Sequence, residues 1–371
     1  MSGDGINSRQ YLALMLFGCL TPMLRRMPRA LAQTAGFAAW LSIIICIAPA
    51  ALMIALHRLL LRSSREGRGM CGILRDTLGR GCGSVFIALY AGWMLYLAGY
   101  VLRGGAERFV TTIYPSSDPL VFMAVTLAAC LFAAMGSLKA IARTAMVFRP
   151  WLLAALVLVF AFSLPDAKLS GLWQPAPGSG SGVVRGCLAA LEPLCFPVCV
   201  VFVQDLCRER LSARRWLPWF VTVFIAEELL YICVIGLFGP ALTAQLSNPF
   251  FSMVRGVSLF GAIERVEAVV VTLWVFSDFV YFSLLIFMAS RSLRFLLGLP
   301  ETEKPRIFDL SRGRWLTVVC AAAAFAVGCC MGLDTRSFNV TSSLVTPLVN
   351  LFFAFAMPAL ALVIGRARRR I

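Results

Sequence analysis

The chain has 371 residues, of which 60% are hydrophobic and only 14% charged, and its mean hydropathy is +0.84. A water-soluble fold of this length cannot bury so much apolar surface, whereas a lipid bilayer solvates it, so the composition predicts a membrane protein. The net charge of +16 does not indicate a nucleic-acid-binding protein, because basic residues between apolar segments are first explained by the orientation of membrane helices.

Cysteine and histidine usage excludes several kinds of site. The 13 cysteines lie mostly within apolar stretches without a paired C-x-x-C motif, so they predict packing residues, not disulfides or a metal site. His57 is the single histidine, and no sequence motif indicates a cofactor. The residues ending at Cys19 resemble a lipoprotein cleavage box, but Asp4 and a lone Arg9 precede them, so we expect no cleavage.

The apolar segments predict an all-α protein that crosses the membrane about ten times, because one helical span needs about 20 mostly apolar residues. In chain order the predicted spans are residues 9–31, 36–60, 82–103, 118–138, 144–163, 183–203, 216–238, 263–290, 315–333 and 343–365.

Basic residues alternate regularly between the loops. The loops predicted to be cytoplasmic carry Arg62, Arg65, Arg68, Arg75, Arg80, Lys139, Arg143, Arg149, Arg208, Arg210, Arg214, Arg215, Arg291, Arg294, Lys304, Arg306, Arg312 and Arg314. The opposite loops carry few basic residues, and the tail 366–371 is again basic, so both termini are predicted to be cytoplasmic. We expect one transmembrane domain over 1–371, in which an external linker at 164–182 separates five-helix repeats at 9–163 and 183–365.

The first predicted span contains a Thr-Pro pair in the middle of its apolar run. Proline removes a backbone hydrogen bond that lipid cannot replace, so such a break is tolerated where protein or a wet cavity surrounds it. The sixth span has a similar pattern, since Leu191-Glu192-Pro193-Leu194 parallels Leu20-Thr21-Pro22-Met23. Interrupted helices at corresponding positions of two halves indicate an inverted-repeat transporter with its ligand site at the breaks. The alternative is that each is an ordinary proline kink.

Several ionisable residues fall inside the predicted spans, where they are candidates for function. Glu192 lies at the second break, where it either contacts a ligand or caps the following half-helix. Glu227 and Glu228 are adjacent and point about 100° apart, so at most one of them faces a given cavity. Glu227 and Asp278 are, with Glu192, the candidates for proton or ion coupling; each is alternatively protonated or paired with a basic residue.

Two further groups mark the third and eighth spans. Arg265 and Glu267, at the outer mouth of the eighth span, are not expected to form a local salt bridge, because an i, i+2 pair does not share a helix face. Mid-span residues Tyr96, Leu97 and Tyr281 are either packing residues or part of the site. The candidate ligand-binding residues are Thr21, Pro22, Met23, Leu97, Glu192, Leu194, Cys195, Phe196 and Tyr281.

Short motifs along most of the chain resemble the spore germination permease family, the GerAB-like B subunits of germinant receptors in the amino acid–polyamine–organocation superfamily. The motifs are INSRQYLALML; Pro28, Ala35, Gly36 and Trp40 in MPRALAQTAGFAAWLS; Leu78, Gly79 and Gly83 in LGRGCG; Gly136, Leu138, Ile141, Ala142 and Arg143 in GSLKAIAR; and Glu264, Arg265, Glu267 and Trp274 in ERVEAVVVTLWVF.

The resemblance implies a LeuT-type fold of two inverted five-helix repeats, with helices 1 and 6 interrupted. It also implies an amino-acid-like germinant, a larger A subunit and a lipoprotein C subunit as partners, and a place in the spore inner membrane. One departure concerns the first span, where the family usually has a glycine-rich bend and this chain has Thr21-Pro22. Arg25 and Arg26, which follow, either extend a positive field toward an acidic ligand or turn outward to the interface.

Two function hypotheses follow from the sequence. In the first, the protein senses a germinant at the two breaks, and binding shifts an equilibrium between cavity conformations. In the second, it is a secondary amino acid transporter, proton-coupled through the intramembrane carboxylates; fold alone does not separate the two. An intramembrane enzyme is not predicted, because no H-E-x-x-H motif, Ser-His dyad or paired catalytic aspartates occur at helical spacing.

Overall fold

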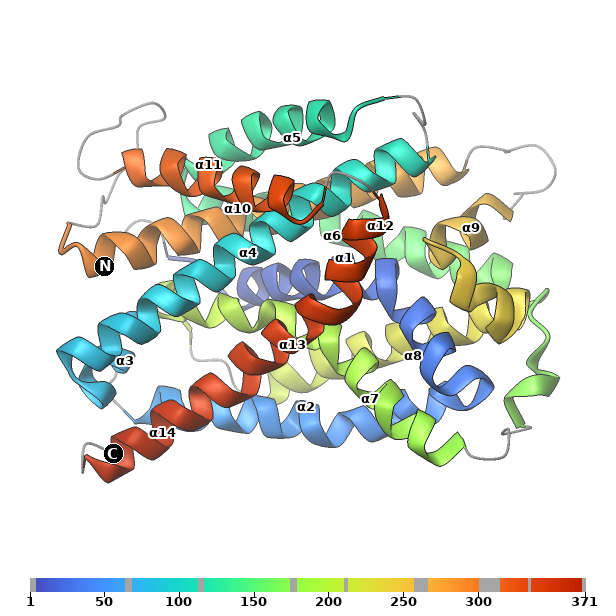
Figure 1. Cartoon of the computed structure of the whole chain (residues 1–371), viewed down its shortest axis with the longest axis horizontal. Helices are drawn as coiled ribbons and strands as arrows, with labels where there is room; N and C mark the ends of the chain where they lie inside the picture. The colour runs from blue at the N-terminus through green and yellow to red at the C-terminus, as the bar shows by residue number, and fades with distance from the viewer. Residues whose placement is uncertain are drawn as a thin grey trace.

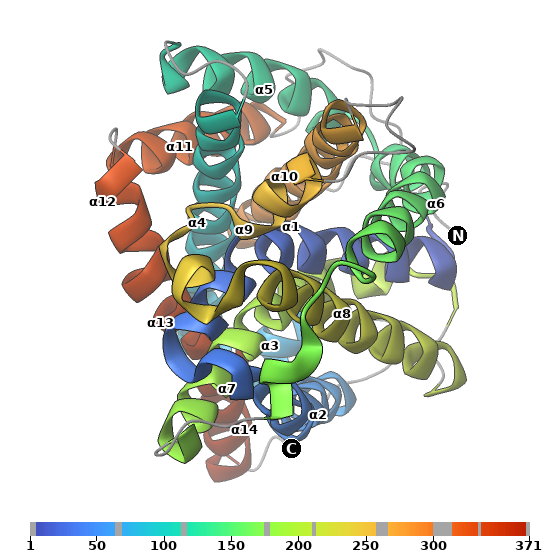
Figure 2. The same cartoon turned by 90° about the vertical axis from the view of Figure 1, so that its right-hand side faces the viewer.

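The computed structural model describes residues 5–63, 69–112, 117–173, 179–209, 213–256, 266–299, 314–332 and 335–368. These residues form a bundle of helices (Figures 1 and 2), and every span predicted from the sequence overlaps one of them. The α-helices of the first half are α1 (Ser8–Ala35), α2 (Ala39–Arg62), α3 (Met70–Leu78), α4 (Arg80–Thr112), α5 (Pro119–Ala134) and α6 (Leu138–Ser163). Those of the second half are α7 (Ser179–Cys195), α8 (Ala213–Gln245), α9 (Pro249–Gly256), α10 (Val266–Leu296), α11 (Trp315–Cys330), α12 (Thr335–Val340), α13 (Thr346–Leu351) and α14 (Met357–Ala367).

Five short segments of other helix types join these elements. They are η1 (Gly36–Ala38), η2 (Leu169–Trp173), η3 (Phe196–Leu206), and the π-helical η4 (Thr341–Val345) and η5 (Phe352–Ala356). Because α12, η4, α13, η5 and α14 follow one another without a gap, the last predicted span is part of one long helical segment.

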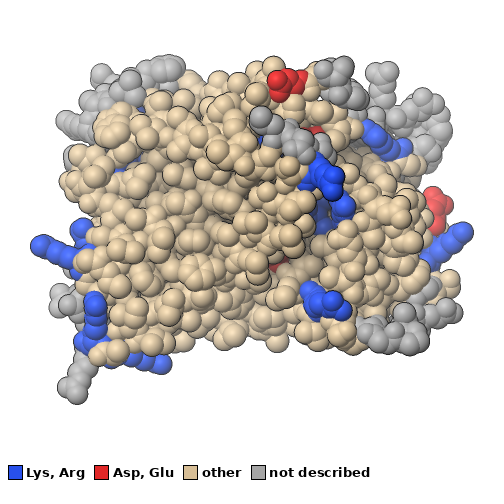
Figure 3. Space-filling view, in the orientation of Figure 1, with Lys and Arg blue, Asp and Glu red and all other residues tan. Residues whose placement is uncertain are grey.

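The length and composition of the helices confirm an all-helical protein that crosses a membrane several times. Among the described residues, seven helical segments are long and apolar enough to span a bilayer, and the first of them, Ser8–Arg62, contains both α1 and α2. The apolar helices α5 and α11 are shorter. Large apolar side chains such as Val125, Trp151 and Leu348 are exposed on the outer helices, and Figure 3 shows, on the face in view, a broad surface without charged side chains. These side chains therefore face lipid.

The first helix is not interrupted, contrary to the expectation from Thr21-Pro22. It remains α-helical from Ser8 to Ala35 with Pro22 and Pro28 inside it, although Figure 1 shows that its ribbon changes direction. Proline removes one backbone donor and bends a helix without necessarily ending it. The helix persists because α1 packs against α7, α8, α10 and α6, so the freed carbonyl is surrounded by protein instead of lipid.

The sixth span does change its backbone, but shortly after Glu192-Pro193, which remain inside the α-helix α7. The α-helix α7 ends at Cys195, and the chain continues as the 3-10 helix η3, with Pro197 in its first turn. A 3-10 segment longer than three or four residues is uncommon and often marks strain or a functional hinge. Of the two predicted irregularities, the second is therefore the more pronounced.

The third span is longer than predicted. Helix α4 continues to Thr112 instead of ending near residue 103, and Arg103, Glu107 and Arg108 in its last turns are buried. The helix can continue past residue 103 because these charged side chains form ion pairs inside the protein instead of facing lipid.

Candidate ligand site around the first helix

Helix α1 lies at the centre of the residues predicted to form the site. It contacts α7, η3, α8 and α10, and Gly18 allows its close approach to η3 and α10. A Cβ atom added at Gly18 would lie 3.0 Å from Tyr281 Cε2 and 3.2 Å from Pro197 Cβ. Only glycine leaves room for α1 to pack this tightly against the start of η3 and the middle of α10.

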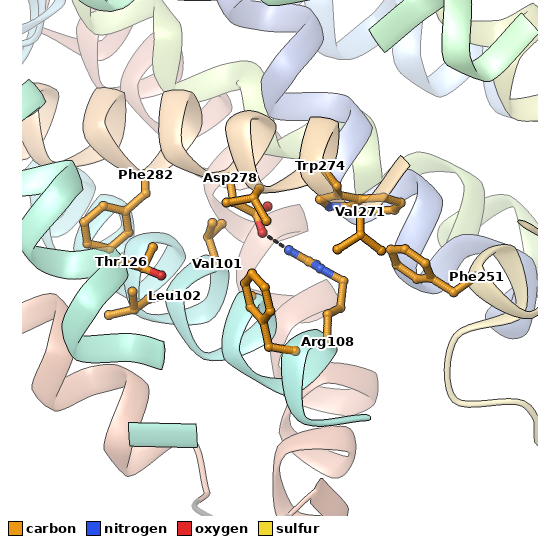
Figure 4. A pocket seen from close by; sticks show the side chains of 12 residues that line it. Val101, Leu102, Arg108, Thr126, Phe251, Val271, Trp274, Asp278 and Phe282 are labelled. Carbon is orange, nitrogen blue, oxygen red and sulfur yellow. Dashed lines mark ion pairs between the residues drawn. The ribbon is translucent and has the colours of Figure 1, made fainter. Parts of the chain in front are cut away.

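Thr21 and Asp278 form one polar contact across the bundle. Thr21 Oγ1 donates a hydrogen bond to Asp278 Oδ1 at 3.0 Å and lies 3.3 Å from Ser277 Oγ, which joins α1 to α10. Asp278 also forms an ion pair with Arg108 of α4 (Figure 4). The Arg108 guanidinium lies 5.0 Å from the ring of Trp274, a cation–π contact. The basic partner that the sequence left open for Asp278 is therefore Arg108.

Glu192 forms a second buried pair beside α1. Its Oε1 lies 3.6 Å from Arg26 Nη1, and the residue is 4% exposed. Glu192 does not cap the following helix, because Cys195 occupies the N-cap position of η3 and makes no side-chain capping bond. The 3.6 Å separation exceeds hydrogen-bond length, so the pair is an electrostatic contact that leaves hydrogen-bonding capacity on both groups.

The junction of α7 and η3 contains the other predicted site residues. Tyr281 of α10 donates a hydrogen bond of 2.7 Å to the backbone carbonyl of Phe196, the first residue of η3. This bond joins α10 to the point where the α-helix changes to a 3-10 helix. The ring of Phe196 lies 5.7 Å from that of Tyr100, which belongs to α4. Cys195 donates to the carbonyl of Leu191 in its own helix, so its thiol is occupied locally.

Other predicted residues do not join these polar contacts. Leu194 lines a separate cavity of about 100 Å³ together with His57 and Trp219. Met23 and Leu97 are buried apolar packing residues. Glu227 is fully buried in α8, and neither of its carboxylate oxygens has a hydrogen-bond partner among the described residues. It therefore stays a candidate for proton or ion coupling, away from the two ion pairs.

Arg25, for which the sequence left two orientations open, has partners that the sequence did not identify. Its guanidinium lies 4.5 Å from the ring of Tyr100 and 4.8 Å from that of Phe338, and Nη2 donates to Ser342 Oγ at 3.0 Å. Arg25 is 5% exposed, so it does not turn outward to the interface. Ser342 lies in the π-helical segment η4, a helix type that occurs frequently at functional sites.

Arg25 also borders a cavity of about 490 Å³, within the size range of small-molecule sites. Figure 3 shows basic side chains gathered in a hollow of the surface. The cavity is lined by side chains from α1, the end of α4, the segment between α8 and α9, and the start of the last helical series: Arg25, Arg26, Arg29, Ala30, Gln33, Gly104, Glu107, Arg108, Ser247, Asn248, Arg336, Phe338, Asn339, Val340 and Ser343.

A sequence signal for this cavity was present in residues 103–108, RGGAER. Arg103 and Glu107 have the i, i+4 spacing of a helical ion pair, and the structure joins them at 2.8 Å. Because the third span was predicted to end at residue 103, Arg108 was expected in a loop.

Glu264 and Arg265 lie outside the described residues, as does the side chain of Glu267.

Comparison with known proteins gives a consistent result. A family profile described as "Spore germination protein" matches residues 6–330. Spore germination protein A2 of Bacillus subtilis (strain 168) is 23% identical over 299 residues, which cover 79% of this chain and 81% of that protein. A Na+-coupled sialic acid symporter, solved in a substrate-bound outward-open state, superposes with a TM-score of 0.60 at 10% identity, over 95% of this chain and 80% of that chain. This last likeness shows a shared transporter fold.

Proposed function

This chain belongs to the spore germination protein family, and we propose that it is the germinant-sensing membrane subunit of a spore germination receptor. Its ligand is a small nutrient of amino-acid type, bound beside α1 in the cavity that Arg25 borders. Family and fold are those of permeases and transporters, not of enzymes. The protein spans the membrane several times, and we place it in the spore inner membrane with both termini in the cytoplasm.

The observation that carries this proposal is the convergence of polar contacts on α1 next to the 490 Å³ cavity. Thr21, Arg25 and Arg26 of one helix contact α10, η4 and α7, respectively. A ligand that displaces any of these contacts changes how α1 is held by the other helices, and this is what a population shift between two conformations requires.

The helix arrangement proposed for this function is a ten-helix, inverted five-plus-five repeat. If α1 and α2 are counted separately and α5 and α11 also cross the membrane, the seven long segments become ten spans. The linker near residues 164–182 then divides two repeats, 9–163 and 183–365, of a single domain. We further propose that a germinant receptor A subunit and a lipoprotein C subunit assemble with this chain.

The alternative function is secondary active transport of an amino acid. Two observations favour it: the symporter that shares the fold couples transport to Na+, and Glu227 is a buried carboxylate without a partner among the described residues. Protonation of such a carboxylate removes the cost of burying its charge, so it suits a proton-coupled cycle.

Radiolabelled uptake into proteoliposomes separates the two functions. A sensor binds the nutrient in proportion to the protein present and accumulates none under a proton or Na+ gradient. Sustained, gradient-driven accumulation would contradict the sensing proposal. A thermal-shift screen of the purified protein with amino acids provides the ligand for this experiment, because a molecule that binds only the native state raises its stability.

A further inference from the structure

The cavity beside α1 has an excess of positive charge. Arg25, Arg26, Arg29, Arg108 and Arg336 line it, and Glu107 is the one carboxylate among its described lining residues. A cavity lined by one sign of charge raises the local concentration of ligands of the opposite sign.

Most of the nearby carboxylates are already paired. Glu107 pairs with Arg103, which lies outside the lining, so its charge is shared between Arg103 and the cavity arginines. Glu192 pairs with Arg26, and Asp278 pairs with Arg108. Each of these two carboxylates is already attracted to an arginine, which weakens its attraction for a ligand ammonium group.

Arg25 is a buried cavity arginine with no ion pair among the described residues, and Glu107 and Glu192 attract its charge only at longer range. It is 5% exposed, it has no carboxylate partner among the described residues, and its Nη1 has no hydrogen-bond partner there. The rings of Tyr100 and Phe338 and the hydroxyl of Ser342 compensate its charge only partly. Burial of a charge without an ion-pair partner is unfavourable, so an anion that enters the cavity gains a strong, charge-assisted contact with Arg25.

We propose that the cavity binds a small organic anion with net negative charge, whose carboxylate or phosphate group is the counter-ion of Arg25. The inference rests on the proposed nutrient-binding function and narrows its ligand: an acidic amino acid or a dicarboxylate fits the charges, whereas a neutral zwitterion leaves the excess of arginines uncompensated.

The backbone of α4 positions Arg25 for this contact. A Cβ atom added at Gly104 would overlap Arg25 Nη1, so glycine at this position lets the guanidinium lie against the helix. Because that guanidinium is the end of a flexible side chain, Gly104→Ala is expected to displace it while keeping its charge and the fold.

The test measures the melting temperature of the purified protein in detergent at constant ionic strength. It compares the values obtained with the two compounds of each matched pair. The pairs are succinate with succinamide and L-glutamate with L-glutamine, and inorganic phosphate is a separate arm. At least one anion is expected to raise the melting temperature in a saturable manner, while its neutral partner does not. A response to phosphate alone assigns the site to phosphate-bearing anions, and a response to succinate or L-glutamate assigns it to carboxylates.

Three variants complete the test. Arg25→Gln and Gly104→Ala are expected to raise the apparent Kd for the active anion about 10- to 100-fold, the effect of losing a charged hydrogen bond. Without ligand, Arg25→Gln should melt at or above the temperature of the parent, because it removes a buried charge without an ion-pair partner. Arg185→Gln, an exposed arginine of α7 outside the cavity, is the control and should bind the anion as the parent does.

Different failures have different meanings. If L-glutamine stabilises the parent and no anion does, the anion proposal is wrong and the nutrient-sensing proposal stands. If anions stabilise Arg25→Gln and Arg185→Gln equally, the effect is a general salt effect and the anion proposal is again wrong. If none of these compounds changes the melting temperature in the parent, both the anion proposal and the amino-acid-type ligand are contradicted.

Discussion

Asp278→Asn tests how much the polar contacts around α1 contribute to stability. The Asp278 and Arg108 side chains are each 7% exposed, so the substitution leaves the guanidinium of Arg108 buried without its counter-ion. Thr21 loses little, because an asparagine oxygen still accepts its hydrogen bond.

The expected cost follows from these contacts. Removing one partner of a buried ion pair costs about 3–5 kcal/mol, mainly because the remaining charge is uncompensated. Arg108 keeps its contact with the Trp274 ring at 5.0 Å, which is worth about 1 kcal/mol. We therefore expect Asp278→Asn to lower the free energy of unfolding by about 3 kcal/mol. Combining it with Arg108→Gln removes both charges and should restore about 2 kcal/mol of that loss.

The assay is denaturation by SDS in mixed micelles, applied to the parent, both single variants and the double variant. Glu209→Gln is the control, since Glu209 pairs with Arg215 near the surface, where both side chains are about half exposed, and no measurable loss is expected. If the losses of the two single variants simply add in the double variant, the pair is not coupled and the reasoning is refuted.

Three further predictions concern the helix irregularities and the orientation. Pro22→Ala restores a helical N–H, so the free energy of unfolding should stay equal or rise by up to about 3 kcal/mol. The ligand-induced shift in melting temperature should fall, because the bend positions Thr21. An unchanged shift would exclude a role for the bend. Glu192→Gln weakens the contact with Arg26 and should reduce ligand response at normal protein level; loss of the protein from the membrane would instead indicate a folding role. A cysteine at Ser179 should be labelled from outside the cell and one at Ser212, which lies outside the described residues, only from inside; the reverse pattern would contradict the orientation.

The sequence anticipated the polar residues of the site better than their partners. Thr21, Glu192 and Asp278 were recognised because a polar residue inside an apolar run is costly in a membrane. Their partners Arg26 and Arg108 lie on other helices, far away in the chain, and pairing across a bundle leaves no local pattern. Arg25 illustrates the same limit, because its sequence position near a span end allowed either an outward or an inward side chain.

The interruption of the first helix was predicted from Thr21-Pro22 and the matching pattern in the sixth span and was wrong, whereas in the sixth span the helix type does change, shortly after Pro193. Both segments contain a proline, so proline chemistry does not distinguish them. The difference lies in their neighbours: α1 is held in helical form by the helices packed around it, whereas the Phe196 carbonyl at the start of η3 accepts a hydrogen bond from Tyr281.

By itself the sequence determined that this protein is a helical membrane protein, where its helices lie and which family it belongs to, because these depend on hydropathy and on motifs that are local in the chain. The tertiary structure decided which charges meet. It paired Asp278 with Arg108 and Glu192 with Arg26, and it left Arg25 buried beside a cavity without a carboxylate partner among the described residues. The physical reason is that burial and ion pairing depend on which helix faces pack together, and hydropathy does not specify that choice.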